Sequence, residues 1–141
     1  MTLILNILDN KSGAWRLFTD GAEKVHEFAM IQGEENILAE LDNFLKKANF
    51  ELKQVKALGL SIKEASLTQV KVIVTIINTL GWQLNIPVSA SFYLSSPVKE
   101  INQQLLASLK NKYEFTSIIP EYSREAEITI SQKTQNFEIE L

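Results

Sequence analysis

The chain has no cysteine, one histidine, three prolines and five glycines among its 141 residues. Without cysteine it can form neither a disulfide framework nor a zinc site that uses thiolates, and the absence fits a cytosolic protein. We therefore expect a cytoplasmic location. His26, the only histidine, has no serine at a spacing typical of a base and its nucleophile. It is more simply explained as a surface or half-buried residue of a strand.

The chain also lacks a large excess of positive or negative residues and any hydrophobic stretch long enough to cross a membrane. The net charge is −3 and the pI is about 5.2, which gives no electrostatic reason to bind nucleic acid or an anionic membrane directly. The opening run from Thr2 to Leu8 is too short to span a bilayer and lacks a basic flank and a cleavage site. It predicts a buried strand. With 45% hydrophobic residues, the chain suits one globular domain over residues 1–141.

The first third of the chain predicts three antiparallel strands joined by short turns. Residues 2–8, 14–19 and 24–31 have strand character. The turns fall at residues 9–13 and at Asp20-Gly21, where Asn, Asp and Gly accept the backbone angles of a hairpin.

From Glu34 onward the hydrophobic period changes, and helices begin to alternate with strands. Leucine, isoleucine and phenylalanine recur at helical spacing from Glu34 to Ala48, with acids near the start and lysines near the end. Asn85 suits the left-handed residue that ends a helix. The remaining predicted elements are a strand over 55–62, a helix over 66–84, a strand over 88–94, a helix from 95 to about 112, and short late strands at 118–120, 127–130 and 137–141.

The helix predicted over residues 66–84 is hydrophobic on more than one side. One group is wide enough to cover a sheet, and consists of Val70, Ile73, Val74, Ile77, Leu80 and Leu84. Val72 and Ile76 form a separate patch flanked by Thr79, whereas Lys71, Thr75 and Asn78 mark the solvated side. A helix with this pattern usually packs against two neighbouring elements, each of which excludes water from one hydrophobic side. The second neighbour is either another part of this domain or another subunit.

This order of elements resembles the ribonuclease H-like fold shared by the actin and sugar-kinase ATPases. It implies an α/β domain with a mixed five-stranded sheet and helices packed on it. Within that fold the chain resembles the TsaB family, whose members are non-catalytic subunits of the bacterial complex that makes threonylcarbamoyl-adenosine in tRNA. Four segments carry the resemblance. Ile4 to Lys11 resembles the family's "ILAIDTS", and Glu35, Ile37 and Leu38 resemble its "HxExLL". Ala57 to Pro87 resembles the family's strand, its "GPGSFTGlR" turn, the helix and "giP", and Pro120 to Ala126 resembles "PxYlRxa".

The chain departs from the TsaB pattern in the turn before the second helix. The glycines expected at 63, 65 and 69 are Lys, Ala and Gln, and the proline expected at 64 is Glu. Phosphate cradling needs backbone N–H groups that glycine leaves accessible, so we expect no nucleotide and no other cofactor. Gly33 stands where the family has a histidine. The resemblance covers the first two-thirds of the chain and the final motif, which implies that the second subdomain is deleted between the third helix and Pro120.

Catalytic interpretations are poorly supported by the residues. A two-metal nuclease needs carboxylates on the first strand, the first helix and the fourth strand. Asp9 and either Glu34 or Glu35 could supply two, but residues 55–62 contain no acid. Asp9 is better explained as a turn residue, and no metal site is expected. Trp15 and Trp82 could stack a base, but without a basic groove we expect them to be packing residues.

The TsaB resemblance implies a scaffold that pairs with TsaD, the ATP-using and metal-dependent paralogue, and stabilises it. In TsaB proteins the first two helices build the pairing surface. Carried over to this chain, the partner-binding residues are Glu34, Ile37, Leu41, Val72, Ile76 and Thr79. The helical pattern selects Val72 and Ile76 independently. Two alternatives stay open, namely a homodimeric structural module that pairs through the same helices, and an enzyme of the same fold with a ligand in the cleft near Asp9.

Overall fold

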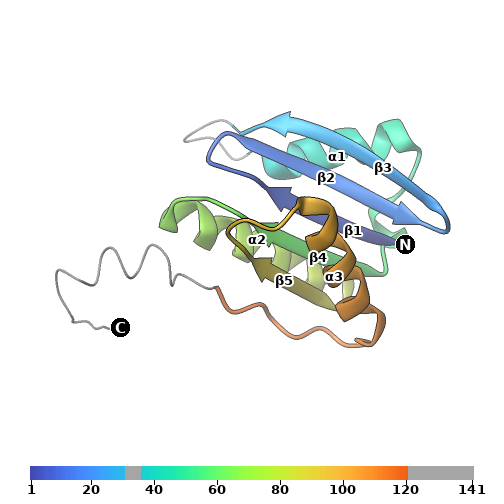
Figure 1. Cartoon of the computed structure of the whole chain (residues 1–141). Helices are drawn as coiled ribbons and strands as arrows, with labels where there is room; N and C mark the ends of the chain where they lie inside the picture. Colours follow the sequence, from blue (N-terminus) through green and yellow to red (C-terminus); the bar gives the residue numbers. More distant parts are fainter. Residues whose placement is uncertain (31–35, 121–141) are drawn as a thin grey trace, which may run out of the picture.

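The computed structural model describes residues 1–30 and 36–120, in which strands and helices follow one another along the chain (Figure 1). The three strands predicted at the start and the later alternation of helix and strand are both present. The elements are β1 (Thr2–Ile7), β2 (Ser12–Thr19), β3 (Ala22–Ala29), α1 (Ile37–Ala48), the 3-10 turn η1 (Leu52–Gln54), β4 (Ala57–Ile62), α2 (Leu67–Leu84), β5 (Val88–Phe92) and α3 (Val98–Lys110).

The five strands form one mixed sheet in the order β3-β2-β1-β4-β5. β1 pairs antiparallel with β2 and parallel with β4, so the sheet changes direction at its central strand. All six residues of β4 are buried, as expected for a strand covered on both faces. The predicted ribonuclease H-like sheet is confirmed.

The two faces of the sheet are covered by different helices (Figure 1). Leu3, Leu5 and Ile7 of β1 belong to the large core that includes the buried residues of α1 and α2. Ile4, whose side chain points the other way, belongs to a smaller core with Ile101 and Leu105 of α3. Because successive side chains of a strand alternate between faces, β1 serves both cores and ties the three layers together.

The ends of α2 are fixed by specific residues. Ser66 caps the start, because its side chain accepts a hydrogen bond from the N–H of Gln69 while the Gln69 side chain accepts from the N–H of Ser66. Asn85 ends the helix in the left-handed conformation with φ of 54°, as predicted. Within residues 1–30 and 36–120, no helix is long and apolar enough to cross a membrane.

The region after α3 differs from its prediction. Residues 118–120 form no strand; instead, Asn78 of α2 donates to the carbonyl of Ile118 at 3.0 Å and accepts from its N–H at 2.7 Å. Asn78 is therefore half-buried rather than solvated. Buried backbone groups need a partner when no neighbouring strand supplies one, and this side chain provides it. The strands predicted at 127–130 and 137–141 lie outside the described residues.

Candidate functional site

The residues predicted to bind a partner separate into two groups in the structure. Ile37 and Leu41 are only 5% and 3% exposed, and they belong to the large core of this chain. Val72 and Ile76 are half-buried on α2, and Thr79 is exposed. Glu34 lies outside the described residues. Of the predicted residues that the structure describes, those of α2 keep side-chain surface open to a partner, and Ile76 also packs partly against the large core.

The orientation of α1 explains why Ile37 points inward. The indole N–H of Trp15 donates to the backbone carbonyl of Ile37 at 3.0 Å, which fixes the start of the helix over β2. On the outer flank, Glu40 lies 2.7 Å from His26 of β3. Leu38 is on the flank of the helix opposite Glu40 and is 48% exposed. It is the hydrophobic residue of α1 that a partner surface could include, and its position on the helical wheel could have identified it.

His26 is held between β3 and α1 by stacking and by a polar contact. Its ring stacks with Phe44 of α1 at a centroid distance of 5.6 Å and with Phe28 at 6.3 Å. Its Nε2 atom pairs with Oε1 of Glu40, and both side chains are less than one-third exposed. His26 was predicted to be a surface or half-buried residue of a strand, and it is half-buried. Its contacts join the edge strand β3 to α1.

The turn between β4 and α2 is occupied by protein side chains. The N–H of Ser66 donates to Oδ1 of Asn10 at 3.1 Å, and Nε2 of Gln69 donates to the carbonyl of Asn10 at 3.2 Å. The N–H of Lys63 is taken by the carbonyl of Ile7 at 2.9 Å. These three hydrogen bonds hold the β4–α2 turn to the end of β1 and to the turn between β1 and β2. Lys63 and Glu64 are exposed beside them.

Asp9 acts as a turn residue, as predicted. Its Oδ1 atom accepts a hydrogen bond from the N–H of Lys11 at 2.8 Å. This bond, together with contacts to Ser12 and the charge of Lys11, lowers the pKa of the Asp9 carboxyl below its usual value. Its oxygen atoms are engaged in shaping the β1–β2 connection.

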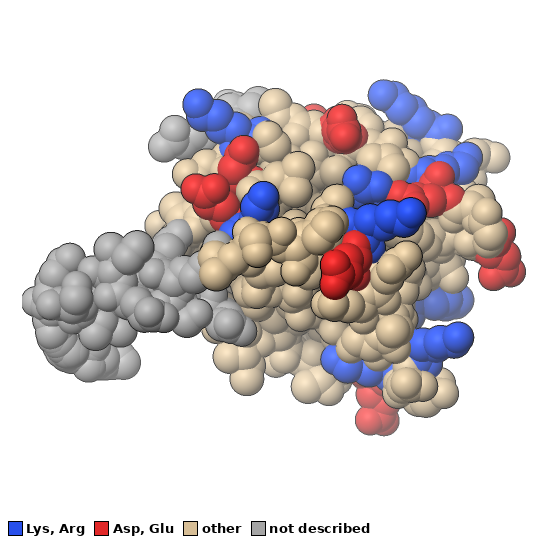
Figure 2. All heavy atoms as spheres, viewed as in Figure 1, with Lys and Arg blue, Asp and Glu red and all other residues tan. Residues whose placement is uncertain are grey.

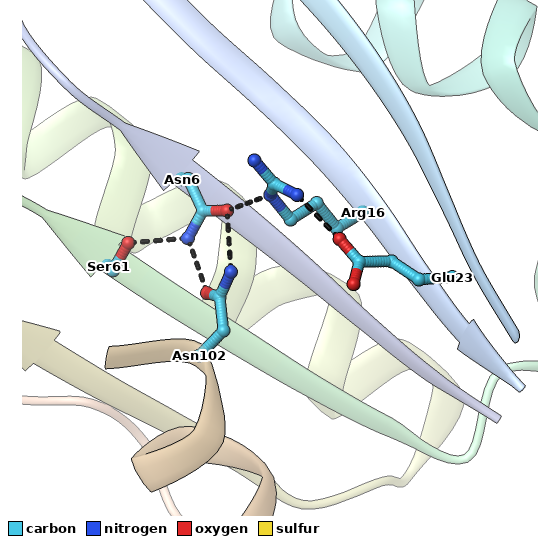
Figure 3. A network of polar contacts seen from close by, with 5 residues as sticks. All are labelled: Asn6, Arg16, Glu23, Ser61 and Asn102. Atoms are coloured by element: carbon cyan, nitrogen blue, oxygen red, sulfur yellow. Dashed lines mark hydrogen bonds and ion pairs between the residues drawn. The ribbon is translucent and has the colours of Figure 1, made fainter. Parts of the chain in front are cut away.

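A buried polar network lies between β1 and α3 and was not predicted from the sequence (Figure 3). Asn6 Nδ2 donates to Ser61 Oγ at 2.6 Å and to Asn102 Oδ1 at 2.8 Å, while Asn6 Oδ1 accepts from Arg16 Nε at 2.9 Å. The guanidinium of Arg16 also pairs with Glu23 at 2.6 Å. The contacts join residues far apart in the sequence, so no local pattern indicates them. The sequence did offer one indication of the network, namely polar residues at positions whose side chains point into the protein.

A cleft of about 460 Å³ opens beside this network, at the end of β1 that leads to Asp9. It forms because α3 packs on β1, β4 and β5, which leaves the same face of β2 and β3 less covered. The cleft contains side chains of both charges. Its lining includes Asn6, Lys11, Ser12, Arg16, Glu27 and Val98.

Charged side chains do not gather into a basic surface on the face that carries α3. Figure 2 shows lysines and arginines interspersed with acids over the described residues of this face. Within residues 1–30 and 36–120, no three or more His, Asp or Glu side chains are grouped so as to hold a metal ion.

The two tryptophans have different environments. Trp15 is fully buried in the large core, which confirms its prediction as a packing residue. Trp82 is 68% exposed near the end of α2, so the corresponding prediction for Trp82 is wrong. Its helical position places it about 140° from Ile77, on the side of α2 away from the sheet. The absence of a basic groove, on which both predictions rested, does not separate a buried tryptophan from an exposed one.

No family model and no curated protein matches the sequence. Among solved structures, YeaZ from Pseudomonas aeruginosa is similar with a TM-score of 0.56 and 20% sequence identity, over 63% of this chain and 43% of that one. Over the matched residues, this chain shares the fold of that part of YeaZ. A second similar structure is an uncharacterized protein with similarity to peptidase YEAZ from Pseudomonas aeruginosa, with a TM-score of 0.55, 20% identity and coverage of 64% and 43%.

YeaZ is a TsaB protein, so this match confirms the predicted resemblance to TsaB at the level of the fold. The chain spans less than half of the length of the YeaZ structures that it matches.

Proposed function

We propose that this chain is a non-catalytic scaffold that pairs with and stabilises a TsaD-like threonylcarbamoyl transferase in tRNA modification. The observation that supports this best is the hydrophobic surface that α1 and α2 leave partly exposed. Leu38 is half-exposed there, and Val72 and Ile76 are only half-buried although their neighbours on α2 pack fully against the sheet. Hydrophobic side chains left at a helix surface in this way are typical of a protein interface.

The occupied turn at the start of α2 supports a role without nucleotide. Phosphate binding at a helix start uses free backbone N–H groups close to the ligand. Here the N–H groups of Lys63, Ser66 and Gln69 already donate to Ile7, Asn10 and the Ser66 hydroxyl. The paired subunit would therefore supply the ATP chemistry, and this chain would supply a hydrophobic surface.

The proposal is tested by co-expressing the tagged chain with the TsaD protein of its own genome and measuring complex formation by size-exclusion chromatography. Ile76→Asp places a charge at the centre of the proposed surface and should abolish the complex, with an unchanged circular dichroism spectrum. Thr75→Asp is the matched control, because it adds the same charge to an exposed position one residue away on α2. Failure of the unmodified chain to pair with TsaD, or equal pairing by Ile76→Asp, would overturn the proposal.

A homodimer through the same side of α1 and α2 is the second candidate, favoured by the same exposed hydrophobic residues. Analytical ultracentrifugation of the isolated chain distinguishes it. A dimer that Ile76→Asp dissociates, together with no binding to TsaD, would favour the homodimeric module.

The cleft beside Asn6 and Arg16 supports a third candidate, a ligand-binding domain of the same fold. Calorimetric titration with magnesium–ATP tests it directly. A saturable heat that Arg16→Ala removes would favour this candidate over the scaffold.

A further inference from the structure

The carboxyl end of α2 carries an open hollow that neither the proposed pairing surface nor the cleft includes. Its volume is about 670 Å³. The lining comes from the last turn of α2, from its C-cap and from the segment after α3. The lining residues are Trp82, Gln83, Asn85, Tyr113, Glu114 and Phe115.

Two large aromatic rings are exposed at this hollow. Trp82 is 68% exposed and Tyr113 is 84% exposed, although both rings carry extensive hydrophobic surface. Phe115 packs partly against the large core beside Gly81, which anchors the segment that carries Tyr113. Exposed tryptophan and tyrosine side chains on anchored backbone are frequent centres of protein interfaces.

The electrostatics of the hollow favour a positive charge. Glu114 is the only charged residue in its lining. The negative end of the α2 dipole lies at the same place, and the last turn of α2 contains no basic residue. The neighbouring Lys112 directs its Nζ atom to the carbonyl of Val88 at 3.4 Å, so its charge is used at β5.

We propose that this hollow binds an arginine side chain of a protein partner. A guanidinium is planar and stacks on aromatic faces, and its N–H groups can donate to the Glu114 carboxylate and to the backbone carbonyls at the end of α2. A nucleic-acid base would also stack on Trp82 and Tyr113, but its phosphate would meet Glu114 and the negative helix end. The inference concerns a surface separate from Val72 and Ile76, and it does not depend on the proposed pairing with TsaD.

The test is a nuclear magnetic resonance titration of the full chain with N-acetyl-arginine methylamide. The matched ligand is N-acetyl-citrulline methylamide, which has a similar planar end group without the charge. The arginine compound should shift the indole N–H of Trp82 and the amide of Glu114, with Trp15 unchanged because it is fully buried. Equal shifts with the citrulline compound, or no shift at Trp82, would overturn the proposal.

Two variants assign the contributions of the ring and the carboxylate. Glu114→Gln should weaken binding of the arginine compound about two- to five-fold, the range that one exposed charge contact supports. Trp82→Ala should remove the saturable shift of Glu114 while the Trp15 signal reports a retained fold. Glu114→Gln binding as tightly as the unmodified chain would contradict a cation site. Glu100→Gln on α3, an exposed acid outside the hollow, serves as the control for net charge.

Discussion

Asn6 of β1 and Asn102 of α3 exchange two side-chain hydrogen bonds across 96 positions of sequence. Nδ2 of Asn6 lies 2.8 Å from Oδ1 of Asn102, and the reverse pair is separated by 3.4 Å. Both residues are almost fully buried, at 1% and 4% exposure. Because an unpaired amide is costly in the interior, this exchange specifies where α3 sits on the sheet.

Asn102→Ala should lower the free energy of unfolding by about 2 kcal/mol, because it leaves a buried polar group of Asn6 with fewer partners. Urea denaturation measures the change. Gln103→Ala, at an exposed position of the same helix, should change it by less than about 0.5 kcal/mol. Additive losses in the Asn6→Ala, Asn102→Ala double variant would contradict the coupling, since residues in contact normally show an interaction energy.

Tyr93 gives the protein a loss of stability at alkaline pH. Its hydroxyl is buried without a hydrogen-bond partner among the described residues. Burial raises the pKa of Tyr93, and the side chain of Ser61 lowers this pKa by a smaller amount. A raised folded-state pKa means that stability is complete below pH about 10 and falls as the pH rises through the folded value. Tyr93→Phe should remove this loss and stabilise the chain by about 1 kcal/mol at pH 7.

Thermal unfolding between pH 8 and pH 11.5 measures the Tyr93 effect. Tyr113→Phe is the control, because that side chain is 84% exposed and should leave the pH dependence unchanged. If Tyr93→Phe loses stability with pH as steeply as the unmodified chain, another group is responsible.

Gly81 allows α2, β5 and the segment after α3 to pack closely. A Cβ atom added there would clash with Cγ1 of Val88 and would lie 3.0 Å from the ring of Phe115. Alanine is intrinsically the better helix residue by about 1 kcal/mol, but overpacking costs about 1–3 kcal/mol. We expect Gly81→Ala to be net destabilising by about 1 kcal/mol in calorimetry.

The Gly81 prediction has an internal control in Val88→Ala, which removes the nearest clashing atom. The double variant should be less destabilised than the sum of the two single variants, because the new methyl group fills the space that valine leaves. Strict additivity would show that the close contact carries no strain.

Ser66 stabilises α2 through its cap. Ser66→Ala should cost about 1 kcal/mol, since the N–H of Gln69 loses its acceptor at 3.2 Å. Ser66→Asp retains an acceptor oxygen and should match the unmodified chain in chemical denaturation. Equal losses in both variants would assign the effect to another feature of the turn.

Local patterns predicted most of the architecture. Short runs of strand-forming residues bounded by turn signals identified β1 to β3, the helical period identified α2, and Asn85 and Gly21 were placed correctly where the backbone takes positive φ. These features depend on neighbours within a few residues, which is the range that sequence periodicity reports. The buried strand predicted over Thr2 to Leu8 is β1, which ends at Ile7, and Leu8 beyond it is 40% exposed.

The candidate sites were predicted less completely, because each depends on which element lies opposite. Ile37 and Leu41 carry the same hydrophobic signal as Leu38, yet the bond from Trp15 and the pairing of Glu40 with His26 turn the first two into the core. Asn78 is polar and was expected in solvent, but the segment at Ile118 covers it.

The order of strands and helices, the ends of α2 and the glycine-free turn before it follow from the sequence alone, whereas α3 spans Val98–Lys110 instead of the predicted residues 95 to about 112. Only the tertiary structure decided that Asn6 meets Asn102, that Trp82 and Tyr113 share one hollow, and that Val72 and Ile76 stay partly outside the core. Backbone preferences and hydrophobic periods act over a few residues, whereas contacts between elements distant in sequence depend on how the complete sheet and its helices pack.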